Sequence, residues 1–344
     1  MTRARVAKIW LIAVAATCVS SCGGGGIQNA LNPQGPNATS LDRLWWLMFY
    51  VCTAVWVLVM IALVLAIRRG RRKSDLNPVL KFSTQTEQRK RNAVLSAVSV
   101  TVIILFVFLI YSYSTGRALT ADLSQKNGLS IEVTGHQWWW EARYNDVDAS
   151  NIFTTANEIH IPVGVPVLFT LHGGDVIHSF WVPNLAGKKD LIPGKISTMW
   201  LQADKPGVYR GQCAEYCGLQ HARMALWIVA EPPDQFNAWR QNQTQSSAPP
   251  TSDSEKRGQQ VFVSSTCVMC HAIGGTTAGS NVGPNLTHVG SRNTLAGATL
   301  SNTREHLMSW ITNSQTFKPG NKMPPNNLGQ QDLDALVDYL QSLK

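Results

Sequence analysis

Two long, nearly uncharged stretches constrain the fold of this chain more than any other feature. Residues 44–67 and 93–113 comprise 24 and 21 residues, and each is long enough to cross the roughly 30 Å of hydrocarbon in a bilayer as a helix. The segment between them, from Arg68 to Asn92, carries nine Lys or Arg against Asp75 and Glu87. Short basic loops stay on the cytoplasmic side of a membrane. The sequence therefore predicts a transmembrane helical hairpin over 44–113, with a cytoplasmic basic loop and both termini outside.

The net charge of +9 does not indicate a nucleic-acid partner. The segment 68–92 contributes +7, and Arg3, Arg5 and Lys8 contribute +3, so the rest of the 344-residue chain sums to about −1. No basic face is left for a phosphate backbone. We therefore expect no nucleic acid among the partners, and the length predicts several modules.

The first 21 residues have the pattern of an export signal. A basic start is followed by an apolar run too short to span a bilayer, and small residues precede Cys22. Small residues before a Cys resemble the cleavage box of lipoproteins, which predicts lipidation of Cys22 at the mature N-terminus. The alternative is ordinary cleavage without lipid. Residues 22–43 are expected to form a flexible segment, because Gly23–Gly26 behaves as a tether.

A short loop concentrates soft metal ligands. Two thiols, an imidazole and a thioether fall within twelve residues, at Cys213, Cys217, His221 and Met224. Thiolate and thioether sulfur select copper(I), zinc or iron clusters, and imidazole suits copper and zinc. A Met at the end of the motif favours copper over zinc. The alternatives are a disulfide between Cys213 and Cys217 in an exported domain or a reactive thiol pair, and neither needs the His or the Met.

This loop resembles the binuclear copper site, called CuA, of cytochrome c oxidase subunit II. In that family two Cys thiolates bridge two copper ions, two His are terminal ligands, and one Met and one backbone carbonyl are weak axial ligands. The implied ligands in this loop are the thiolates of Cys213 and Cys217, the imidazole of His221, the thioether of Met224 and the backbone carbonyl of Glu215. The segment from Asp175 to Pro183 resembles the family's upstream ligand segment, which implies that His178 is the second imidazole.

Beyond Gly116 the pattern changes to short β-rich runs separated by turn residues. The runs lie at 129–135, 159–163, 167–171, 198–201, 207–211 and 225–230, which predicts a β-sandwich or barrel. By the resemblance, residues 117–240 form a cupredoxin-like CuA domain. His178 and the loop 213–224 are then expected to meet at one end of it.

Three adjacent Trp, at 138–140, resemble the family's aromatic segment beside the copper. Alternate side chains of a strand face opposite sides, so at least one Trp is expected at a surface or interface. The resemblance implies that Trp138 receives electrons through an exposed indole over the metals. It also implies that the side chain of Glu215 reaches a magnesium ion shared with subunit I. Lys195 stands where the family usually has Arg, so a salt contact there loses bidentate geometry.

A covalent haem site is predicted near the C-terminus. A stretch rich in Gln, Ser, Thr and Pro at 241–254 predicts a linker, and Cys267-Val268-Met269-Cys270-His271 follows it. This C-x-x-C-H run is the signature of haem c, in which thioethers from Cys267 and Cys270 fix the porphyrin and His271 binds the iron. The alternative is a chance redox or zinc pair. Residues 255–344 resemble an all-α class I cytochrome c domain, with helices expected at 255–263, 304–312 and 332–343.

The second axial ligand of the haem is predicted to be Met323. Its surroundings, Lys322-Met323-Pro324-Pro325, resemble the cytochrome Met loop, and Met/His ligation raises the haem potential. Met308 lies in an amphipathic pattern and is expected in the core, and Met269, inside the haem motif, cannot reach the far face. His288 and His306 are rivals only if Met323 proves free.

Taken together, the chain resembles subunit II of a haem-c-fused (caa-type) cytochrome c oxidase, a multi-domain protein of the bacterial cell membrane. The resemblance implies that electrons pass from cytochrome c or a preceding complex to haem c, then to the copper pair, then to the haem-copper oxygen site of subunit I, with proton translocation. Subunit I and other oxidase subunits are the implied partners. Glu87 is the only acid where the family has a Glu near a proton path, but Lys90 replaces the Trp that follows it there, which favours a solvated loop charge.

Two other classes of function remain open on the sequence. One is a terminal reductase with the same copper module that reduces nitric or nitrous oxide. The other is a non-enzymatic lipoprotein that carries electrons or handles copper alone. Quinol oxidases are disfavoured, because they lack the copper ligands that this chain retains.

Overall fold

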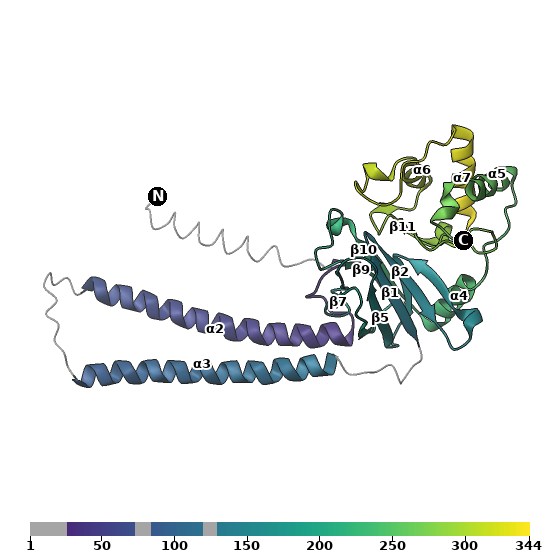
Figure 1. Ribbon diagram of the computed structural model, residues 1–344. Coiled ribbons are helices and arrows are strands. Elements are labelled where there is room, and N and C mark those ends of the chain that lie inside the picture. The colour runs from purple at the N-terminus through teal and green to yellow at the C-terminus, as the bar shows by residue number, and fades with distance from the viewer. Residues whose placement is uncertain (1–25, 73–83, 120–128) are drawn as a thin grey trace, which may run out of the picture.

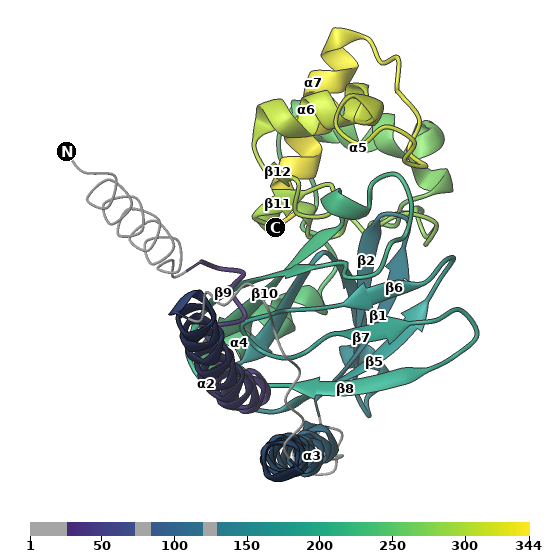
Figure 2. The ribbon, with the colours of Figure 1, turned by 90° about the vertical axis from the view of Figure 1, so that its left-hand side faces the viewer.

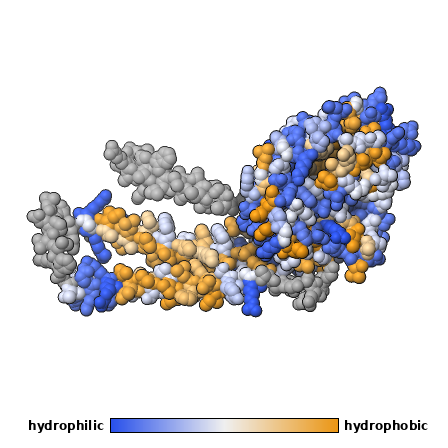
Figure 3. All heavy atoms as spheres, in the orientation of Figure 1, coloured by the Kyte–Doolittle hydropathy of each residue, from blue (hydrophilic) through white to orange (hydrophobic). Residues whose placement is uncertain are grey.

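The computed structural model describes residues 26–72, 84–119 and 129–344, and Figure 1 shows two long helices beside two compact units. Helices α2 (Pro36–Arg72) and α3 (Thr84–Leu119) contain the two predicted apolar stretches and extend beyond them. Both are long and apolar enough to cross a membrane, and Figure 3 shows their apolar side chains at the surface. They fit a two-pass membrane protein. The predicted signal, Cys22 and the middle of the basic loop lie outside the described residues.

The N-terminal end of α2 is attached to the β-rich unit. The Ala38 amide donates a hydrogen bond to the Leu185 carbonyl at 3.1 Å, and Asn37 Nδ2 donates to the Trp200 carbonyl at 2.7 Å. Gly35 has no room for a side chain, because a Cβ there would lie 2.1 Å from the Gln202 carbonyl oxygen. The structure thus differs from the flexible segment predicted over 22–43, since its C-terminal part is bonded to the folded unit.

The β-rich unit consists of two sheets. One has the order β3-β2-β1-β5-β8 and the other β4-β10-β9, and β6 pairs with β7 separately. The strands are β1 (Ser130–His136), β2 (Trp139–Asn145), β3 (Phe153–Ala156), β4 (Glu158–Pro162), β5 (Val167–Gly173), β6 (His178–Phe180), β7 (Lys189–Leu191), β8 (Ser197–Leu201), β9 (Gly207–Gln212) and β10 (Ala225–Glu231). β1 runs parallel to β5 and antiparallel to β2. The predicted β-sandwich is confirmed.

The core of the sandwich lies between the two sheets. Residues along β1 alternate between buried and half-buried, as a strand with one covered face requires. The same alternation in β2 buries Trp140, Ala142 and Tyr144. Helix α4 (Pro233–Gln243) follows β10, and its Trp239 stacks on His160 of β4 with ring centroids 4.1 Å apart. The runs predicted from the sequence did not include β2, β3, β6, β7 or α4.

The C-terminal unit is helical and has its own core. It contains α5 (Asp253–Ser264), α6 (Arg304–Thr312), α7 (Gln330–Ser342) and the short pair β11 (Thr294–Leu295) and β12 (Leu300–Ser301). Phe262 of α5 packs near Tyr339 of α7 inside this core. Gly258 permits the close crossing of α5 and α7, because a Cβ there would lie 2.0 Å from the Ala335 carbonyl oxygen. The three predicted helices are present within two residues of their expected ends.

Short 3₁₀ helices complete the two units: η2 (Ala149–Asn151), η3 (His221–Arg223), η4 (Thr266–Met269), η5 (Val289–Ser291) and η6 (Ser314–Thr316). The helical unit lies against one end of the β-sandwich, as Figures 1 and 2 both show. The Ala225 amide donates to the Gly297 carbonyl at 3.1 Å, and Gln220 Nε2 donates to the Pro319 carbonyl at 2.7 Å. The contact therefore forms at the loop between β9 and β10, which contains the predicted copper ligands.

Candidate metal centre and haem pocket

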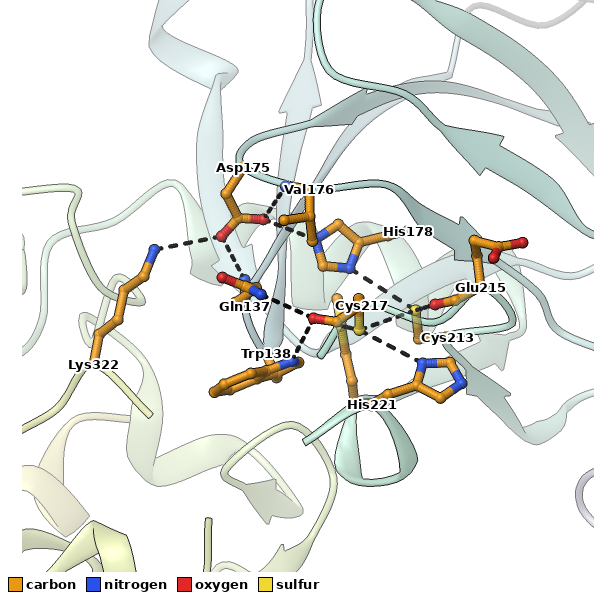
Figure 4. Close-up of polar contacts among 11 residues, drawn as sticks. Gln137, Trp138, Asp175, Val176, His178, Cys213, Glu215, Cys217, His221 and Lys322 are labelled. Atoms are coloured by element: carbon orange, nitrogen blue, oxygen red, sulfur yellow. Dashed lines mark hydrogen bonds and ion pairs between the residues drawn. The ribbon is translucent and has the colours of Figure 1, made fainter. Parts of the chain in front are cut away.

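The predicted copper ligands converge at the end of the β-sandwich (Figure 4). The Sγ atoms of Cys213 and Cys217 are 3.7 Å apart. His178 Nδ1 lies 3.9 Å from Cys213 Sγ, and His221 Nδ1 lies 3.5 Å from Cys217 Sγ. Met224 Sδ is 3.8 Å from Cys217 Sγ, and the Glu215 carbonyl oxygen is 3.3 Å from Cys213 Sγ. His178 comes from β6 and the others from the β9–β10 loop, so the fold joins two distant segments.

The chemistry of this donor set fits soft metal ions. His178, Cys213 and Cys217 are all buried, with ligand atoms within 4.8 Å of one another. Thiolate sulfur with imidazole suits copper and zinc, and thioether sulfur adds a preference for copper. A 3.7 Å separation of the two Sγ atoms allows both to face a shared pair of ions. Both Cys are free thiols, so the alternative of a disulfide is not what the structure contains.

The two thiols share their protons unequally. The hydrogen bond from Cys217 holds the pKa of Cys213 well below its ordinary value, with a further contribution from His178. The pKa of Cys217 is raised, first by its bond to Cys213 and then by burial. Metal ligation requires both thiols to be deprotonated, so metal binding must release the proton of Cys217.

Asp175 orients His178 and was not singled out as a site residue from the sequence. Its Oδ1 lies 2.9 Å from His178 Nε2, and its two oxygens accept the amides of Val176 and Gln137, each at 2.8 Å. A carboxylate that accepts the outer N–H of a ligating His fixes the tautomer, which leaves Nδ1 free for the metal. Its position three residues before His178 was the available signal.

Trp138 is covered, which corrects the expectation of an exposed indole. Its exposed fraction is 8%, because the helical unit lies over it. Trp138 Nε1 and Gln137 Nε2 both donate to the Cys217 carbonyl at 2.9 Å. The indole thus contacts the backbone of a predicted copper ligand on one side. As expected, at least one Trp of the run lies at an interface, which here is the contact between two domains of the same chain.

A second site is an apolar cavity of about 460 Å³. It is lined by the predicted haem residues Cys267, Cys270, His271 and Met323 and by core side chains of the helical unit. His271 Nδ1 lies 2.7 Å from the Pro284 carbonyl, so Nε2 is left as the ligand atom. Burial lowers the pKa of His271, which keeps the imidazole neutral and able to bind a metal. These residues fit a covalently attached haem.

The rival haem ligands lie elsewhere. Met308 packs against the helical core, as predicted. His288 is buried, with Nε2 3.1 Å from the Gln245 carbonyl, and His306 Nδ1 lies 3.0 Å from the Ser301 carbonyl. These three residues are not among those that line the haem cavity. Met269 lines it but is 68% exposed and lies inside the C-x-x-C-H motif. Met323 remains the predicted second ligand.

The haem cavity opens onto the β-sandwich. His136, Gln137, Trp138 and Trp139 line the same cavity as the haem-binding residues. Lys322, next to Met323, has its Nζ 3.4 Å from Asp175 Oδ2, the carboxylate that holds His178. The two candidate sites therefore share a wall. No sequence motif could have located this wall, because its residues come from separate domains.

The remaining predicted residues receive less support. The side chain of Glu215 is exposed. Within the described ranges, the cluster of His178, Cys213 and Cys217 is the one group of three or more His, Cys, Asp or Glu side chains that could hold a metal. Magnesium binding by Glu215 stays a prediction. Glu87 lies in the first turn of α3 and pairs with Lys90 at 2.8 Å, and Lys195 is exposed.

Comparison with known proteins agrees with the arrangement of the domains. Residues 148–231 match the family described as the periplasmic domain of cytochrome c oxidase subunit II, and residues 255–344 match cytochrome c. The chain is 38% identical to cytochrome c oxidase subunit 2 of Alkalihalophilus pseudofirmus over 333 residues, which cover 95% of this chain and 94% of the relative. It is 31% identical over 291 residues to the subunit 2 of a Bacillus species, covering 80% and 79%. It is also 30% identical over 254 residues to quinol oxidase subunit 2 of Bacillus subtilis, covering 71% and 75%.

Two helices long and apolar enough to cross a membrane, a cupredoxin-like sandwich and a cytochrome c domain define the subunit II class of the cytochrome c oxidases. The chain belongs to the cytochrome c oxidase subunit 2 family and carries a fused C-terminal cytochrome c domain.

Proposed function

We propose that this subunit accepts electrons through haem c and passes them by a binuclear CuA centre to the haem-copper oxygen site of subunit I, coupled to proton translocation. One observation carries the proposal. Trp138 donates to the Cys217 carbonyl in the copper loop and at the same time lines the haem cavity. A single side chain thus connects the two candidate sites, as a short electron path requires.

The copper ligands follow from the converging donors. The thiolates of Cys213 and Cys217, the imidazoles of His178 and His221, the thioether of Met224 and the Glu215 carbonyl would together hold the two copper ions. Bound copper would supply a one-electron carrier. The chain contributes a fixed geometry, because β6 and the β9–β10 loop place the donors on a packed sandwich. Asp175 holds His178 in the required tautomer.

The residues that line the haem cavity would hold the second cofactor. Cys267 and Cys270 would hold the haem through thioether links, and His271 and Met323 would supply its two iron ligands. Haem c would supply a second one-electron carrier, whose potential Met/His ligation raises. The Pro284 carbonyl orients His271 through Nδ1.

The buried position of Trp138 changes its proposed role. A soluble cytochrome c or a preceding complex cannot contact an indole that the fused domain covers. The external donor would therefore reduce the haem of the fused domain, and Trp138 would serve the internal transfer to copper. The cytochrome c domain in this way occupies the surface that an external donor would otherwise use.

Dioxygen reduction is assigned to a partner subunit. All eight His of the chain lie at or beyond residue 136, so neither apolar helix carries the His that a membrane-embedded haem-copper site needs. Two helices whose apolar side chains are exposed provide surface for lipid and for subunit I. Other oxidase subunits and a cytochrome c donor complete the proposed set of partners.

The orientation in the membrane follows from charge. Basic residues at both inner helix ends, such as Arg68 and Arg91, favour a cytoplasmic loop. Both termini and both redox domains would then lie on the outer side of a bacterial cell membrane. Lipidation of Cys22 and a magnesium contact of Glu215 are the further parts of this proposal that rest on resemblance.

The deciding experiment is metal and haem analysis of the intact purified complex, followed by turnover assays. We expect two copper ions and one covalent haem c on this subunit, and consumption of dioxygen rather than of nitric or nitrous oxide. Zinc or no metal at the Cys213–Cys217 site would overturn the proposal. Purification without a large multi-span haem subunit would instead favour a carrier that acts alone.

A further inference from the structure

The buried contact between the two redox domains contains a lysine that the copper and haem ligand sets do not use. Lys318 follows η6 in the cytochrome c domain and is only 2% exposed. Its Nζ donates to the Trp138 carbonyl at 2.7 Å and to the Ala296 carbonyl at 3.0 Å. One acceptor belongs to the cupredoxin-like domain and the other to the cytochrome c domain. The ammonium group therefore joins the two domains at the residue that connects the candidate sites.

A lysine is rarely buried without a counter-ion, because the charge loses its hydration. Within the described ranges Lys318 has no carboxylate partner at ion-pair distance. Burial lowers the pKa of Lys318 to about 7, and the nearby Arg223 acts in the same direction. We therefore expect that the buried ammonium group of Lys318 has a specific role that offsets the cost of its burial.

The loop between β11 and β12, in the same domain as Lys318, supplies one of the two carbonyls that accept its hydrogen bonds. Ala296, Gly297 and Ala298 between β11 and β12 all have positive φ, at 54°, 67° and 56°, which is costly for the two alanines. A Cβ at Gly297 would lie 3.1 Å both from Lys318 Nζ and from the Trp138 carbonyl oxygen. The Gly297 carbonyl in turn accepts the Ala225 amide. The loop thus holds the Ala296 carbonyl against the ammonium group and the Gly297 carbonyl against the Ala225 amide of the other domain.

We propose that Lys318 is a positioning residue that seats the haem cavity on Trp138 and holds its ammonium group against the residue whose indole bonds the copper loop. This inference rests on the function proposed above and deepens it. Lys318, Trp138, Ala296 and Gly297 all line the haem cavity, so movement of the lysine changes the contact between that cavity and the indole. The indole keeps its bond to the Cys217 carbonyl.

The test uses the complete oxidase complex, with copper and haem contents and absorption spectra recorded first. Lys318→Met removes the ammonium group but keeps an apolar chain, and Lys256→Met makes the same change where the side chain is 60% exposed on α5. We expect Lys318→Met to slow haem-to-copper electron transfer after rapid photoreduction several-fold, because the rate of electron tunnelling falls steeply as the distance between the two carriers grows. Lys256→Met should leave the rate unchanged.

Two further measurements distinguish this role from a merely structural one. At pH 6, where Lys318 is charged, Lys318→Met should lower the midpoint potential of the copper centre, because a nearby positive charge is lost. Gly297→Ala keeps the charge and should leave the potential unchanged while it slows the transfer. Deuterium exchange at the Ala225 amide, which reports the domain contact, should increase in both variants.

A Lys318→Met complex with full copper and haem, a wild-type transfer rate and wild-type Ala225 protection would overturn the inference. If Lys318→Met loses haem, the same two measurements on Gly297→Ala decide, and wild-type values there would overturn it. A wild-type complex without copper refutes the proposed function alone, because Ala225 exchange still tests the domain contact.

Discussion

The carboxylate of Asp175 lies 2.9 Å from His178 Nε2, so it fixes the orientation of the imidazole whose Nδ1 faces Cys213. The same carboxylate accepts two backbone amides, and Lys322 of the cytochrome c domain approaches it. Burial raises the pKa of Asp175, but the hydrogen bonds from His178 and from the two amides outweigh it and keep the pKa low. The ionised carboxylate therefore sets the orientation of a ligand at one site and contacts the domain that contains the other.

Replacement of Asp175 should weaken copper binding without removing a ligand. Asp175→Asn is expected to reduce copper affinity by about 10- to 100-fold, the usual cost of losing such a supporting group. Copper titration followed by the visible spectrum measures this. Asp190→Asn, an exposed acid of β7, is the matched control. Equal affinity for the two variants would show that Asp175 does not support His178.

Loss of a predicted bridging thiol should remove the copper centre but leave haem c in place. In Cys217→Ser the two-copper spectrum is expected to disappear, because an alcohol cannot replace the thiolate that faces Cys213 Sγ, His221 Nδ1 and Met224 Sδ. Haem c should remain attached, since Cys267 and Cys270 lie in another domain. Absorption and electron paramagnetic resonance spectra of the purified variant provide the measurement. An unchanged copper signal would contradict the bridge assignment.

The second haem ligand can be tested in the same way. Met323→Ala should lower the haem potential or make the iron high-spin, because the thioether that stabilises reduced iron is lost. Met308→Ala is the control, since Met308 packs in the core and its loss should affect stability but not spin state. Redox titration and the haem spectrum distinguish the two variants. An unchanged haem potential and spectrum in Met323→Ala would show that another residue is the second axial ligand.

The stability of the copper domain should depend on pH through a buried network. His160 Nδ1 lies 3.0 Å from Glu231 Oε2 and its Nε2 lies 3.3 Å from Glu158 Oε1, and the Asn293 amide of the cytochrome c domain donates to Glu158 at 3.0 Å. Burial opposes both charges, but the mutual hydrogen bonds outweigh it, so the pKa of His160 is raised above 6.5 and that of Glu158 is lowered below 4.5.

The direction of the pH effect follows from these two shifts. The contribution of His160 is fully present below pH 6.5 and is lost as the pH rises through its raised pKa, whereas that of Glu158 is present above pH 4.5 and is lost as the pH falls through its lowered pKa. The network should thus stabilise the domain most between about pH 4.5 and 6.5. Thermal unfolding across pH measures this, and His160→Gln should remove the loss on the alkaline side. An unchanged alkaline profile in that variant would show that His160 is not its source.

Local patterns in the sequence determined most of the parts of this protein. Apolar runs of 24 and 21 residues can be satisfied only by long helices in an apolar environment, and both helices are present. The C-x-x-C-H motif and the Cys213–Met224 loop are likewise short, so residue types and spacing predicted a haem site and a soft-metal site, and the family resemblance implied the individual ligands. The β-sandwich followed from short β-rich runs separated by turn residues, although β2 was missed, because Glu141 and Arg143 interrupt its apolar pattern, and β3 was missed as a strand of four residues.

Only the tertiary structure decided how the two sites meet. Trp138 is covered, Asp175 supports His178, and Lys318 reaches the Trp138 carbonyl across 180 residues of sequence. The positions of Trp138 and Lys318 have no local pattern, because they depend on where one folded domain lies against the other, whereas the support of His178 by Asp175 has only the i,i+3 spacing as its signal. Side-chain spacing within a segment is fixed by the covalent chain and by secondary structure, whereas contact between segments depends on packing that the segments do not encode separately.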